Sequence, residues 1–541
     1  MTFVINQGCC KDSSCIPVCP VQCIRPRPGD PDFTTAEQLY IDPATCIDCG
    51  ACMDECPVNA IDSEFDLSEE SADYLDINAE YFAANPIAES LPPDLVYRKL
   101  PAGRAELSVA IVGSGPAACY AAGELSDIKG VTVSMFERLP TPFGLVRAGV
   151  APDHPRTKQI ANRFGSVLAR PGVHCFFNTE VGRDISIDEL LEHHHAVLWA
   201  GGADDDRRLG IPGEELPGCF SAREFVAWYN GHPDFTGHRF DLTGRRAVVL
   251  GNGNVALDAA RVLARPAGAL EPTDIAPHAV ELLGASLIED VVVAARRGPE
   301  HAAYSTGELL ALDSTEGVAL RAVPGEADSL AGRTDRQAAV VQAAVVRAAG
   351  RDSGGADDGE RTITLRYGLT PVSVNGDGAV ESVTFRRPDG STETIETSFV
   401  LRAVGYRGRS VAGLPFDDVT GTLPHRSGAV YDPESGMPVV GVYCAGWIKR
   451  GANGMIGSNR TDSAETVEAL LNDLAGGRLT DPVHDVEHLA QLVSERNPDV
   501  VDKHAWTRID QAERRLGREA GRARVKLVSV AELLAASRVT S

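Results

Sequence analysis

Two glycine-rich turns, each set between an apolar strand and a helix, constrain the fold of this chain more than any other feature. The first turn, Gly113-x-Gly115-x-x-Ala118, follows the apolar segment 107–112, and the next strand pattern ends at Glu137. Small residues let backbone amides at a helix N-terminus approach a pyrophosphate, and an acid ending the next strand can bind a ribose. The unit predicts a dinucleotide site; the alternative is a tight strand-to-helix turn without a ligand.

A second unit of this kind begins with the strand pattern 246–250. Its turn, GNGNVA, starts at Gly251, and the following strand ends in Arg296 and Arg297. An arginine at this position fits the 2′-phosphate of NADP by charge and by paired hydrogen bonds, although a solvated arginine pair is the alternative. One acid-ended and one arginine-ended unit predict FAD at the first turn and NADPH at the second.

Cysteines gather near the start of the chain. The run Cys46-x2-Cys49-x2-Cys52-x3-Cys56-Pro57 has the spacing of bacterial ferredoxins, in which the fourth cysteine serves a second cluster. Zinc sites usually pair two short Cys-x2-Cys units across a longer gap, and disulfides fit secreted scaffolds. Iron–sulfur clusters are therefore the favoured interpretation.

A second, reciprocal run is present at Cys9, Cys10, Cys15 and Cys19-Pro20. With it, residues 1–66 resemble a two-cluster ferredoxin of the seven-iron type. The resemblance implies a [4Fe–4S] cluster held by Cys19, Cys46, Cys49 and Cys52, and a second cluster held by Cys9, Cys15 and Cys56. Three ligands suit [3Fe–4S]. Cys10 is an alternative to Cys9, and if both bind, the second cluster can be [4Fe–4S].

The charge is acidic and uneven. The net charge is −25, and residues 1–100 hold 18 acidic against 5 basic residues, a net of −13. This balance disfavours nucleic acid and anionic membranes as partners, and suits docking against a basic protein face. The chain starts without a secretion-signal pattern and has no apolar run of membrane-spanning length, so we expect a cytoplasmic protein.

Disulfide reductases share the two-turn architecture, but they need a redox-active cysteine pair beside the flavin. The cysteines after residue 57 stand alone in the sequence, so that chemistry is disfavoured. NADPH gives two electrons as a hydride, an iron–sulfur cluster takes one, and a flavin can exchange either. The ferredoxin-like segment therefore offers the route by which electrons leave the flavin.

Four motifs of the remaining chain support a family resemblance. Residues 105–541 resemble the adrenodoxin-reductase type of ferredoxin–NADP reductase, and the whole chain resembles a ferredoxin/ferredoxin–NADP reductase fusion. The motifs are LPTPFGLVRAGVAPDHP (139–155), GNGNVALD (251–258), AARRGPEHAAYSTGEL (294–309) and CAGWIKRGANGMIGSNRTDSAETV (444–467).

The resemblance implies electron transfer between NADPH and one-electron iron–sulfur acceptors through FAD, with the ferredoxin domain as a relay to a ferredoxin or a cytochrome P450. An alternative is an electron-input subunit of a larger, glutamate-synthase-type oxidoreductase. An alternative from another class is a redox-sensing module with little turnover.

The resemblance also implies site residues. Those expected to line FAD are Gly113, Gly115, Ala117, Glu137, Leu145, Val181, Trp447, Gly454, Met455 and Ile456. Those expected to hold NADPH are Asn252, Gly253, Asn254, Val255, Arg296, Arg297 and Glu308. His154 would lie near the flavin, but the family's usual carboxylate three residues after the Glu308 position is Ala311 here. Hydride transfer needs no general base, so no catalytic side chain is predicted.

The expected architecture is α/β, with two Rossmann-like dinucleotide-binding domains preceded by a small α+β two-cluster ferredoxin domain. The NADP domain is expected to be inserted within the FAD domain, and the C-terminal tail is expected to form packing helices. The expected boundaries are 1–66 for the ferredoxin domain, 67–104 for a linker, 105–202 and 404–541 for the FAD domain, and 203–403 for the NADP domain.

Overall fold

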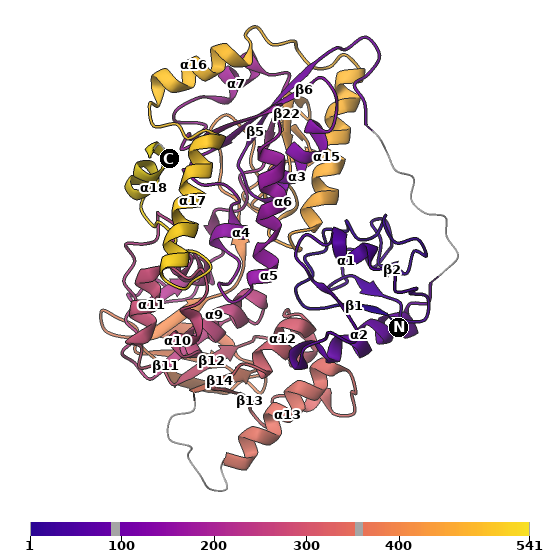
Figure 1. Cartoon of the computed structure of the whole chain (residues 1–541). Coiled ribbons are helices and arrows are strands. Elements are labelled where there is room, and N and C mark those ends of the chain that lie inside the picture. Colours follow the sequence, from indigo (N-terminus) through magenta and orange to yellow (C-terminus); the bar gives the residue numbers. More distant parts are fainter. Residues whose placement is uncertain (1, 88–97, 352–360, 540–541) are drawn as a thin grey trace.

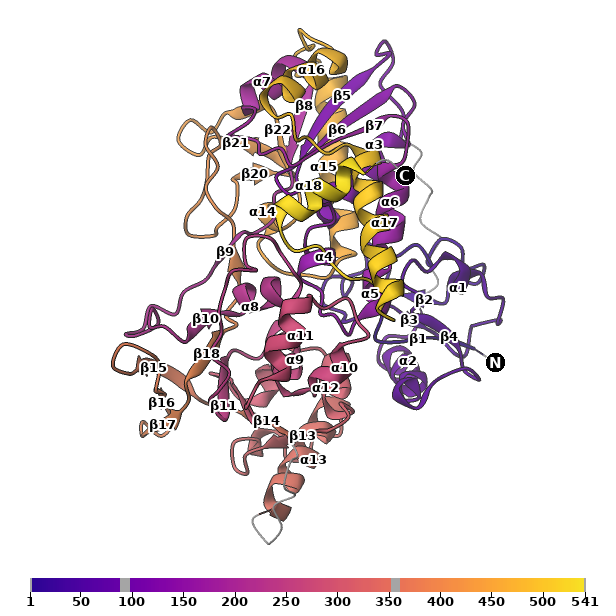
Figure 2. The same ribbon diagram turned by 60° about the vertical axis from the view of Figure 1, so that its left-hand side comes forward.

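The computed structural model describes residues 2–87, 98–351 and 361–539. Figures 1 and 2 show a seven-stranded sheet at the top, a six-stranded sheet below it, and the N-terminal ferredoxin-like domain beside the junction of the two. Among the described residues, no helix combines the length and apolar character needed to cross a lipid bilayer.

The seven-stranded sheet holds the first glycine turn. Five neighbouring strands of this sheet, β22, β8, β5, β6 and β7, are parallel to one another. Strands β21 and β20 continue the sheet beyond β22 as antiparallel strands. In spatial order the strands are β20 (His425–Arg426), β21 (Ala429–Tyr431), β22 (Pro438–Cys444), β8 (Ala196–Trp199), β5 (Leu107–Val112), β6 (Val131–Glu137) and β7 (Val173–Phe177).

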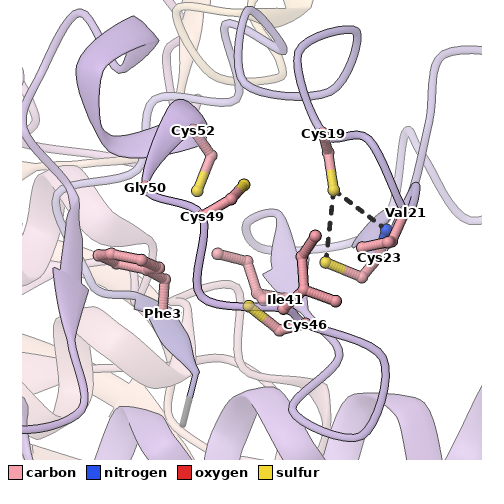
Figure 3. A pocket seen from close by; sticks show the side chains of 10 residues that line it. Phe3, Cys19, Val21, Cys23, Ile41, Cys46, Cys49, Gly50 and Cys52 are labelled. Carbon is pink, nitrogen blue, oxygen red and sulfur yellow. Dashed lines mark hydrogen bonds between the residues drawn. The ribbon is translucent and has the colours of Figure 1, made fainter.

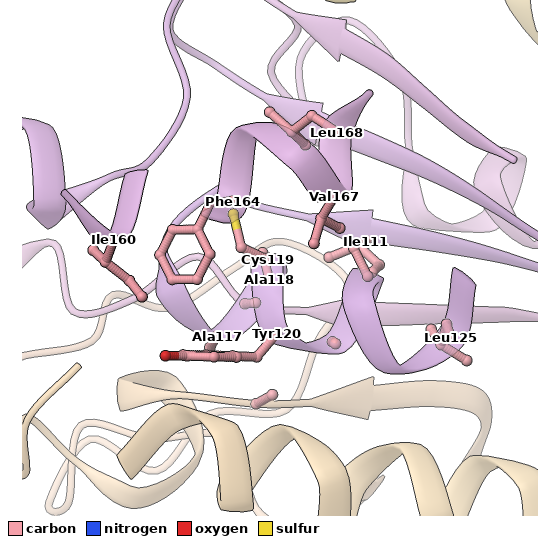
Figure 4. Close-up of a cluster of buried hydrophobic side chains, with 14 of the residues drawn as sticks. Ile111, Ala117, Ala118, Cys119, Tyr120, Leu125, Ile160, Phe164, Val167 and Leu168 are labelled. Carbon is pink, nitrogen blue, oxygen red and sulfur yellow. The ribbon is translucent and has the colours of Figure 1, made fainter. Parts of the chain in front are cut away.

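Helices α3 (Pro116–Ser126), α6 (Ile160–Leu168) and α15 (Ser458–Ala475) pack together beside this sheet. Figure 4 shows the apolar side chains between α3 and α6, where the rings of Tyr120 and Phe164 meet edge to face at 5.1 Å. The burial of these faces fixes the direction in which the N-terminus of α3 points.

The six-stranded sheet holds the second glycine turn and is parallel throughout. Its central strands β11, β12 and β18 consist mainly of apolar residues, as expected when helices cover both faces. In spatial order they are β10 (Cys219–Ser221), β18 (Phe399–Arg402), β11 (Arg246–Leu250), β12 (Asp290–Ala294), β14 (Arg361–Arg366) and β13 (Val318–Ala322).

All strands of the six-stranded sheet fall in sequence between β8 and β20, so the second unit is inserted within the first. The chain crosses from one sheet to the other twice, and the two crossings pair as the antiparallel strands β9 (Asp205–Asp206) and β19 (Tyr406–Arg407). The predicted fold class is confirmed. A small antiparallel sheet of β15 (Thr370–Asn375), β16 (Ser382–Arg386) and β17 (Thr392–Glu396) is appended to the inserted unit.

The remaining helices cover the sheets or connect strands. They are α4 (Leu145–Ala148), α5 (Pro155–Lys158), α7 (Ile187–His193), α8 (Ala222–Tyr229), α9 (Asn254–Ala264), α10 (Ala267–Leu270), α11 (Pro277–Gly284), η2 (Pro299–His301), α12 (Thr306–Asp313), η3 (Asp328–Leu330), α13 (Arg336–Arg351), α14 (Trp447–Arg450), α16 (Val486–Arg496), α17 (Lys503–Glu519) and α18 (Val530–Arg538). The tail packs as expected, with Trp506 of α17 edge to face against Phe143.

The ferredoxin-like domain is built from two short antiparallel pairs. Strand β1 (Phe3–Ile5) pairs with β4 (Ile61–Ser63), and β2 (Ile24–Arg25) pairs with β3 (Tyr40–Ile41). The helix α1 (Ala51–Glu55) lies within the run of closely spaced cysteines, carries Cys52 and ends before Cys56.

The segment 67–104, expected to be a linker, differs from that expectation. It contains the turn η1 (Glu69–Ser71) and the helix α2 (Asp73–Ala84), and α2 packs on β1 and β3. The buried Asn78 accepts from the amides of Ile5 (3.3 Å) and Ile41 (2.8 Å) and donates to the Ile5 carbonyl (2.9 Å). One side chain thus joins both strand pairs, so α2 belongs to the ferredoxin-like domain. Residues 88–97 lie outside the described residues.

Replacement of Asn78 by alanine should destabilise this domain, because it strips partners from buried amides of two strands. At about 1–3 kcal/mol for each buried group left unpaired, we expect a loss of about 2–4 kcal/mol. Calorimetry of the full chain measures it as a lower midpoint of the least stable transition. Asn85→Ala, which removes an exposed bond to the Tyr81 carbonyl, is the control. Equal effects of the two variants would contradict the role of Asn78.

Candidate functional site: two nucleotide turns and two thiol sites

The first glycine turn leaves the end of β5 with no side chain in the way. Gly113 has φ +101°, and a Cβ there would lie 2.5 Å from the Ala200 carbonyl oxygen. Gly115 caps α3, and a Cβ on the facing Gly144 would lie 3.0 Å from its Cα. The N-terminus of α3, where Ala117 lies, is therefore lined by backbone, as a pyrophosphate site requires.

Glu137 ends β6 beside this turn. Its carboxylate accepts from the amide and hydroxyl of Ser114, at 3.2 and 2.7 Å, and from the amide of Leu139 at 3.1 Å. Burial raises the pKa of Glu137, while the hydrogen bonds of Ser114 and Leu139 act to lower it. The carboxylate is fixed at the end of the strand next to the glycine turn, the position from which a ribose would be bound.

The residues expected around a flavin ring lie on three separate segments. Leu145, the first residue of α4, is 42% exposed. Trp447 begins α14 and stacks on Tyr406 with ring centres 5.5 Å apart. The run Gly454, Met455 and Ile456 directly precedes α15, with the Met455 amide donating to Ser458 Oγ.

Val181 differs from the other residues that are expected to line FAD. Its side chain is buried in the core beside Phe136, so only its backbone is available to a ligand. Near Trp447 and Tyr406 there is a hollow lined by residues that include Arg207, Thr422 and Asn453.

The second turn repeats the geometry of the first. Gly251 has φ +126°, and a Cβ there would lie 2.3 Å from the Ala403 carbonyl oxygen. The turn leads through Asn252 and Gly253 into α9, and the Asn254 side chain accepts from the Ser305 amide at 2.8 Å. This bond ties the start of α9, including Val255, to the segment that carries Glu308.

Arg296 and Arg297 follow β12 and are exposed. In the described part of the chain no carboxylate pairs with either side chain. Two free guanidinium groups at a strand end beside a glycine turn suit an added phosphate.

His154 lies beside two carboxylates, although Ala311 replaces the carboxylate that the family usually has three residues after the Glu308 position. Its Nε2 lies 3.1 Å from Asp258 Oδ1 on α9 and 3.6 Å from Glu308 Oε2 on α12. The sequence analysis missed Asp258, although it stands at the end of the quoted motif GNGNVALD. The structure thus places His154 where elements of both dinucleotide units meet.

Arg261 completes this cluster. Its guanidinium bonds to Asp153 at 2.8 Å and Asp258 at 2.7 Å, and its Nη2 lies 2.6 Å from His154 Nε2. A neutral Nε2 can accept from Arg261, and a protonated one can donate to Asp258, so the proton on this atom decides between two partners. The spacing of His154, Asp258 and Glu308 would allow a metal, but Arg261 already supplies a positive charge there.

The cluster shifts the pKa of each member. Burial acts to lower the pKa of His154, but the hydrogen bond and negative charge of Asp258 outweigh it, so the pKa is raised. Burial acts to raise the pKa of Asp258, but Arg261 and His154 hold it below its usual range. Burial and the charge of Asp258 raise the pKa of Glu308. The site therefore favours a protonated His154 and an ionised Asp258.

Four thiols form what we call the outer thiol site: Cys19, Cys46, Cys49 and Cys52. They surround a small cavity, with Phe3 and Ile41 as apolar walls (Figure 3). Cys23 also lines the cavity, with its sulfur 3.4 Å from that of Cys19. Four thiols around one cavity on a short loop and a helix start fit a cubane cluster.

Cys9, Cys10, Cys15 and Cys56 form the inner thiol site. The first three are buried and Cys56 is half-buried. The pKa of Cys9 is raised to about 11, mainly by burial, and the charge of a Cys56 thiolate acts in the same direction. Buried thiols that would repel one another as thiolates require a bound cation to ionise together, which fits an iron cluster. Both Cys9 and Cys10 belong to the inner thiol site, so either thiol can be the cluster ligand.

Replacement of Asp258 by asparagine should lower the pKa of His154. The substitution keeps a hydrogen-bond partner but removes the charge that offsets burial, and we expect a fall of about one unit or more. Histidine-selective NMR measures it, with His154→Gln identifying the resonance. Asp188→Asn, at an exposed position of helix α7, is the control. An unchanged titration of His154 would show that Asp258 does not set its protonation.

The comparisons with known proteins agree with both halves of the site. Residues 39–62 match the 4Fe-4S binding domain family and residues 107–289 match the pyridine nucleotide-disulphide oxidoreductase family. A probable ferredoxin/ferredoxin–NADP reductase of Mycobacterium leprae is 46% identical over 99% of this chain and 98% of its own length. A mitochondrial NADPH:adrenodoxin oxidoreductase of Arabidopsis thaliana is 38% identical over 80% of this chain and 95% of its own.

Among solved structures, Mycobacterium tuberculosis FprA in complex with NADPH superposes with a TM-score of 0.73. It is 40% identical and covers 80% of this chain and 99% of its own. Because the similarity to the fused relative spans nearly all of both chains, this chain belongs to the family of ferredoxin/ferredoxin–NADP reductases.

Proposed function

We propose that the chain is a ferredoxin–NADP reductase that moves electrons between NADPH and one-electron iron–sulfur acceptors through FAD, with its own ferredoxin domain as a relay. The observation that carries this proposal is the presence, in one chain, of two glycine turns with opposite strand-end charges and two groups of four thiols. The names of the relatives support it.

The proposed site residues are those that the family resemblance implies, and the geometry of the two glycine turns and the two thiol sites supports them. Residues proposed for FAD are Gly113, Gly115, Ala117, Glu137, Leu145, Val181, Trp447, Gly454, Met455 and Ile456. Residues proposed for NADPH are Asn252, Gly253, Asn254, Val255, Arg296, Arg297 and Glu308. The outer thiol site is proposed for [4Fe–4S], and the inner site for [3Fe–4S], or for [4Fe–4S] if both Cys9 and Cys10 bind.

Bound FAD would supply the conversion between electron pairs and single electrons. Glu137 and the start of α3 would orient its adenosine half, and the run before α15 would present backbone amides to the other end. Arg296 and Arg297 would hold the 2′-phosphate, while the exposed Gly454 leaves room for a nicotinamide. His154, when protonated at Nε2, donates to Asp258 and, by linking α5 to α9, helps to keep the two nucleotide units in register.

The finer properties are also proposals. We propose a cytoplasmic protein whose external acceptor is a ferredoxin or a cytochrome P450. Domain limits of 105–202 with 404–541 for FAD, and 203–403 for NADP, are supported by the strand order. For the ferredoxin domain we now propose residues 1–87, because α2 packs on it.

NADPH alone should reduce the purified holoprotein. In anaerobic stopped-flow experiments, we expect flavin absorbance to bleach and the iron–sulfur EPR signals of samples frozen afterwards to differ from those of the oxidised protein. Steady NADPH oxidation coupled to reduction of an added one-electron acceptor would favour a self-contained reductase over a subunit of a glutamate-synthase-type complex. Absence of flavin bleaching, in protein that contains FAD, would end the proposal and favour a sensing module.

Charge reversal at the strand end should remove the preference for NADPH. With Arg296→Glu and Arg297→Glu together, we expect kcat/KM for NADPH to fall about 10²–10⁴-fold, since each of the two lost charge-assisted bonds costs about 1.5–3 kcal/mol. The value for NADH should change much less. Arg333→Glu, an exposed arginine elsewhere in the inserted unit, is the control. An equal fall of kcat/KM for NADPH and NADH would show that Arg296 and Arg297 support folding and do not bind the 2′-phosphate.

A further inference from the structure

The ferredoxin domain is docked on the reductase through one particular loop. Residues 10–14, which we call the docking loop, lie against the start of α15. The Gly457 amide donates to the Cys10 carbonyl at 2.7 Å, and a Cβ on Gly457 would lie 2.0 Å from the Lys11 carbonyl carbon. Two backbones therefore touch at the residue that follows Gly454–Ile456, the run proposed to face the flavin.

Asp12 anchors the docking loop. It is 3% exposed, accepts from the Tyr120 hydroxyl of α3 at 2.6 Å, and lies 3.3 Å from Arg163 of α6 and 3.6 Å from Arg460 of α15. The same two arginines donate to Ser14, at 2.6 and 3.0 Å. A buried carboxylate with three reductase partners is a specific fit, because burying it unpaired would be costly.

Acidic residues of the ferredoxin domain meet arginines at two further places. Arg336 of α13 lies 3.0–3.3 Å from the carboxylates of Asp73, Asp76 and Glu80 of α2, and Arg156 lies 3.0 Å from Asp62. The Glu37 carboxylate accepts from the Thr306 amide at 2.8 Å, and this contact reaches α12 of the inserted unit. The domain thus contacts both dinucleotide units, which sets its orientation.

In this orientation the two thiol sites differ in exposure. Cys9, Cys10 and Cys15 of the inner site are buried, and the Cys10 carbonyl accepts from the Gly457 amide of the reductase, whereas Cys49 of the outer site is exposed and Cys46 and Cys19 are half-buried. This difference between the two sites was not predicted from the cysteine spacing.

Exposed apolar residues flank three cysteines of the outer site in the sequence. Val18, Ile47 and Met53 are 37%, 58% and 42% exposed, and each is adjacent in sequence to a cysteine of the outer site. Asp48 and Asp54 are exposed beside them. We call Val18, Ile47, Cys49 and Met53, with Asp48 and Asp54, the exit surface.

The exposed charged residues of the ferredoxin domain, which carries the exit surface, are acidic. Residues 2–84 contain 16 acidic residues and only three basic ones, Lys11, Arg25 and Arg27. All three basic residues are buried, at 2%, 8% and 8% exposure. A partner with a positively charged contact face and an apolar centre therefore fits the exit surface by charge and by chemistry.

We propose that electrons enter the ferredoxin domain at the inner thiol site and leave from the outer one, to a one-electron redox protein with a basic face that docks on the exit surface. This inference rests on the proposed function. One NADPH gives a hydride, becomes NADP⁺, and after two single-electron transfers leaves one proton in solution and two acceptor molecules reduced. Each electron passes through the inner site and then the outer site.

The exit surface is tested with cytochrome c, a basic one-electron haem protein, as the probe. Asp48→Lys with Asp54→Lys should lower its rate constant of reduction about tenfold or more at low ionic strength, and weaken the salt dependence. Ferricyanide reduction and flavin bleaching should be unchanged. Glu281→Lys with Glu434→Lys, an exposed pair on the reductase, makes the same change of net charge as a control. Equal effects of the two pairs would overturn the exit surface.

The entry side is tested by undocking the loop. Arg163→Glu places a negative charge against Asp12 and Glu55, and should slow cluster reduction by NADPH about tenfold or more, with flavin bleaching unchanged. Arg170→Glu, just beyond the end of the same helix, makes the same change of charge against Asp127 of the reductase and is the matched control. Rapid freeze-quench EPR follows the clusters. Cluster reduction at the unmodified rate in Arg163→Glu would overturn the docked entry.

The order of the two sites is tested with Cys49→Ser, analysed for iron content. We expect the inner EPR signal still to respond to NADPH at the unmodified rate, while cytochrome c reduction is lost. An inner site that keeps its iron but no longer responds to NADPH would reverse the order. Because flavin bleaching is read in every sample, failure of the proposed function, seen as no bleaching, is distinct from failure of this inference.

Discussion

The close approach of two backbones at Gly457 is the contact on which the relay depends. Gly457 has φ −68°, an ordinary helical value, so its backbone conformation does not require glycine. Glycine is required because a Cβ would overlap the main chain of Lys11 and Asp12. Asp12, with Tyr120, Arg163 and Arg460 around it, then holds the loop at that distance. If the docking loop lay further from the start of α15, the ferredoxin domain would be joined to the reductase by the chain alone. In this structure it is also docked on the reductase.

The parts of the structure that the sequence predicted are those with local causes. Gly113 and Gly251 are needed because carbonyl oxygens of Ala200 and Ala403 come within 2.5 Å of where a Cβ would stand, and such turns recur with a recognisable spacing. The cysteine runs were readable because cluster ligation needs thiols at fixed intervals on a short loop. The insertion of one unit in the other followed from the family resemblance, and the strand order agrees with it.

The parts that were missed depend on contacts between distant segments. Asp258 stands 104 residues after His154, and only the packing of α9 on the preceding unit brings them together. Helix α2 was hidden by its acidic composition, although Tyr74, Asn78 and Phe82 recur every four residues, the spacing of one helix face. Its acids looked like a solvated linker because their partner, Arg336, lies about 260 residues away.

Composition alone also cannot say what the acidic residues of the ferredoxin domain do. Asp12, Asp62, Asp73, Asp76 and Glu80 are engaged by arginines of the reductase, whereas no ion pair is found for Asp48 or Asp54 in the described part of the chain. The same excess of charge therefore serves two faces. Because the first acceptor is covalently attached, its docking is intramolecular and needs no long-range attraction. The unpaired acids around Cys49 are then free to attract a second protein.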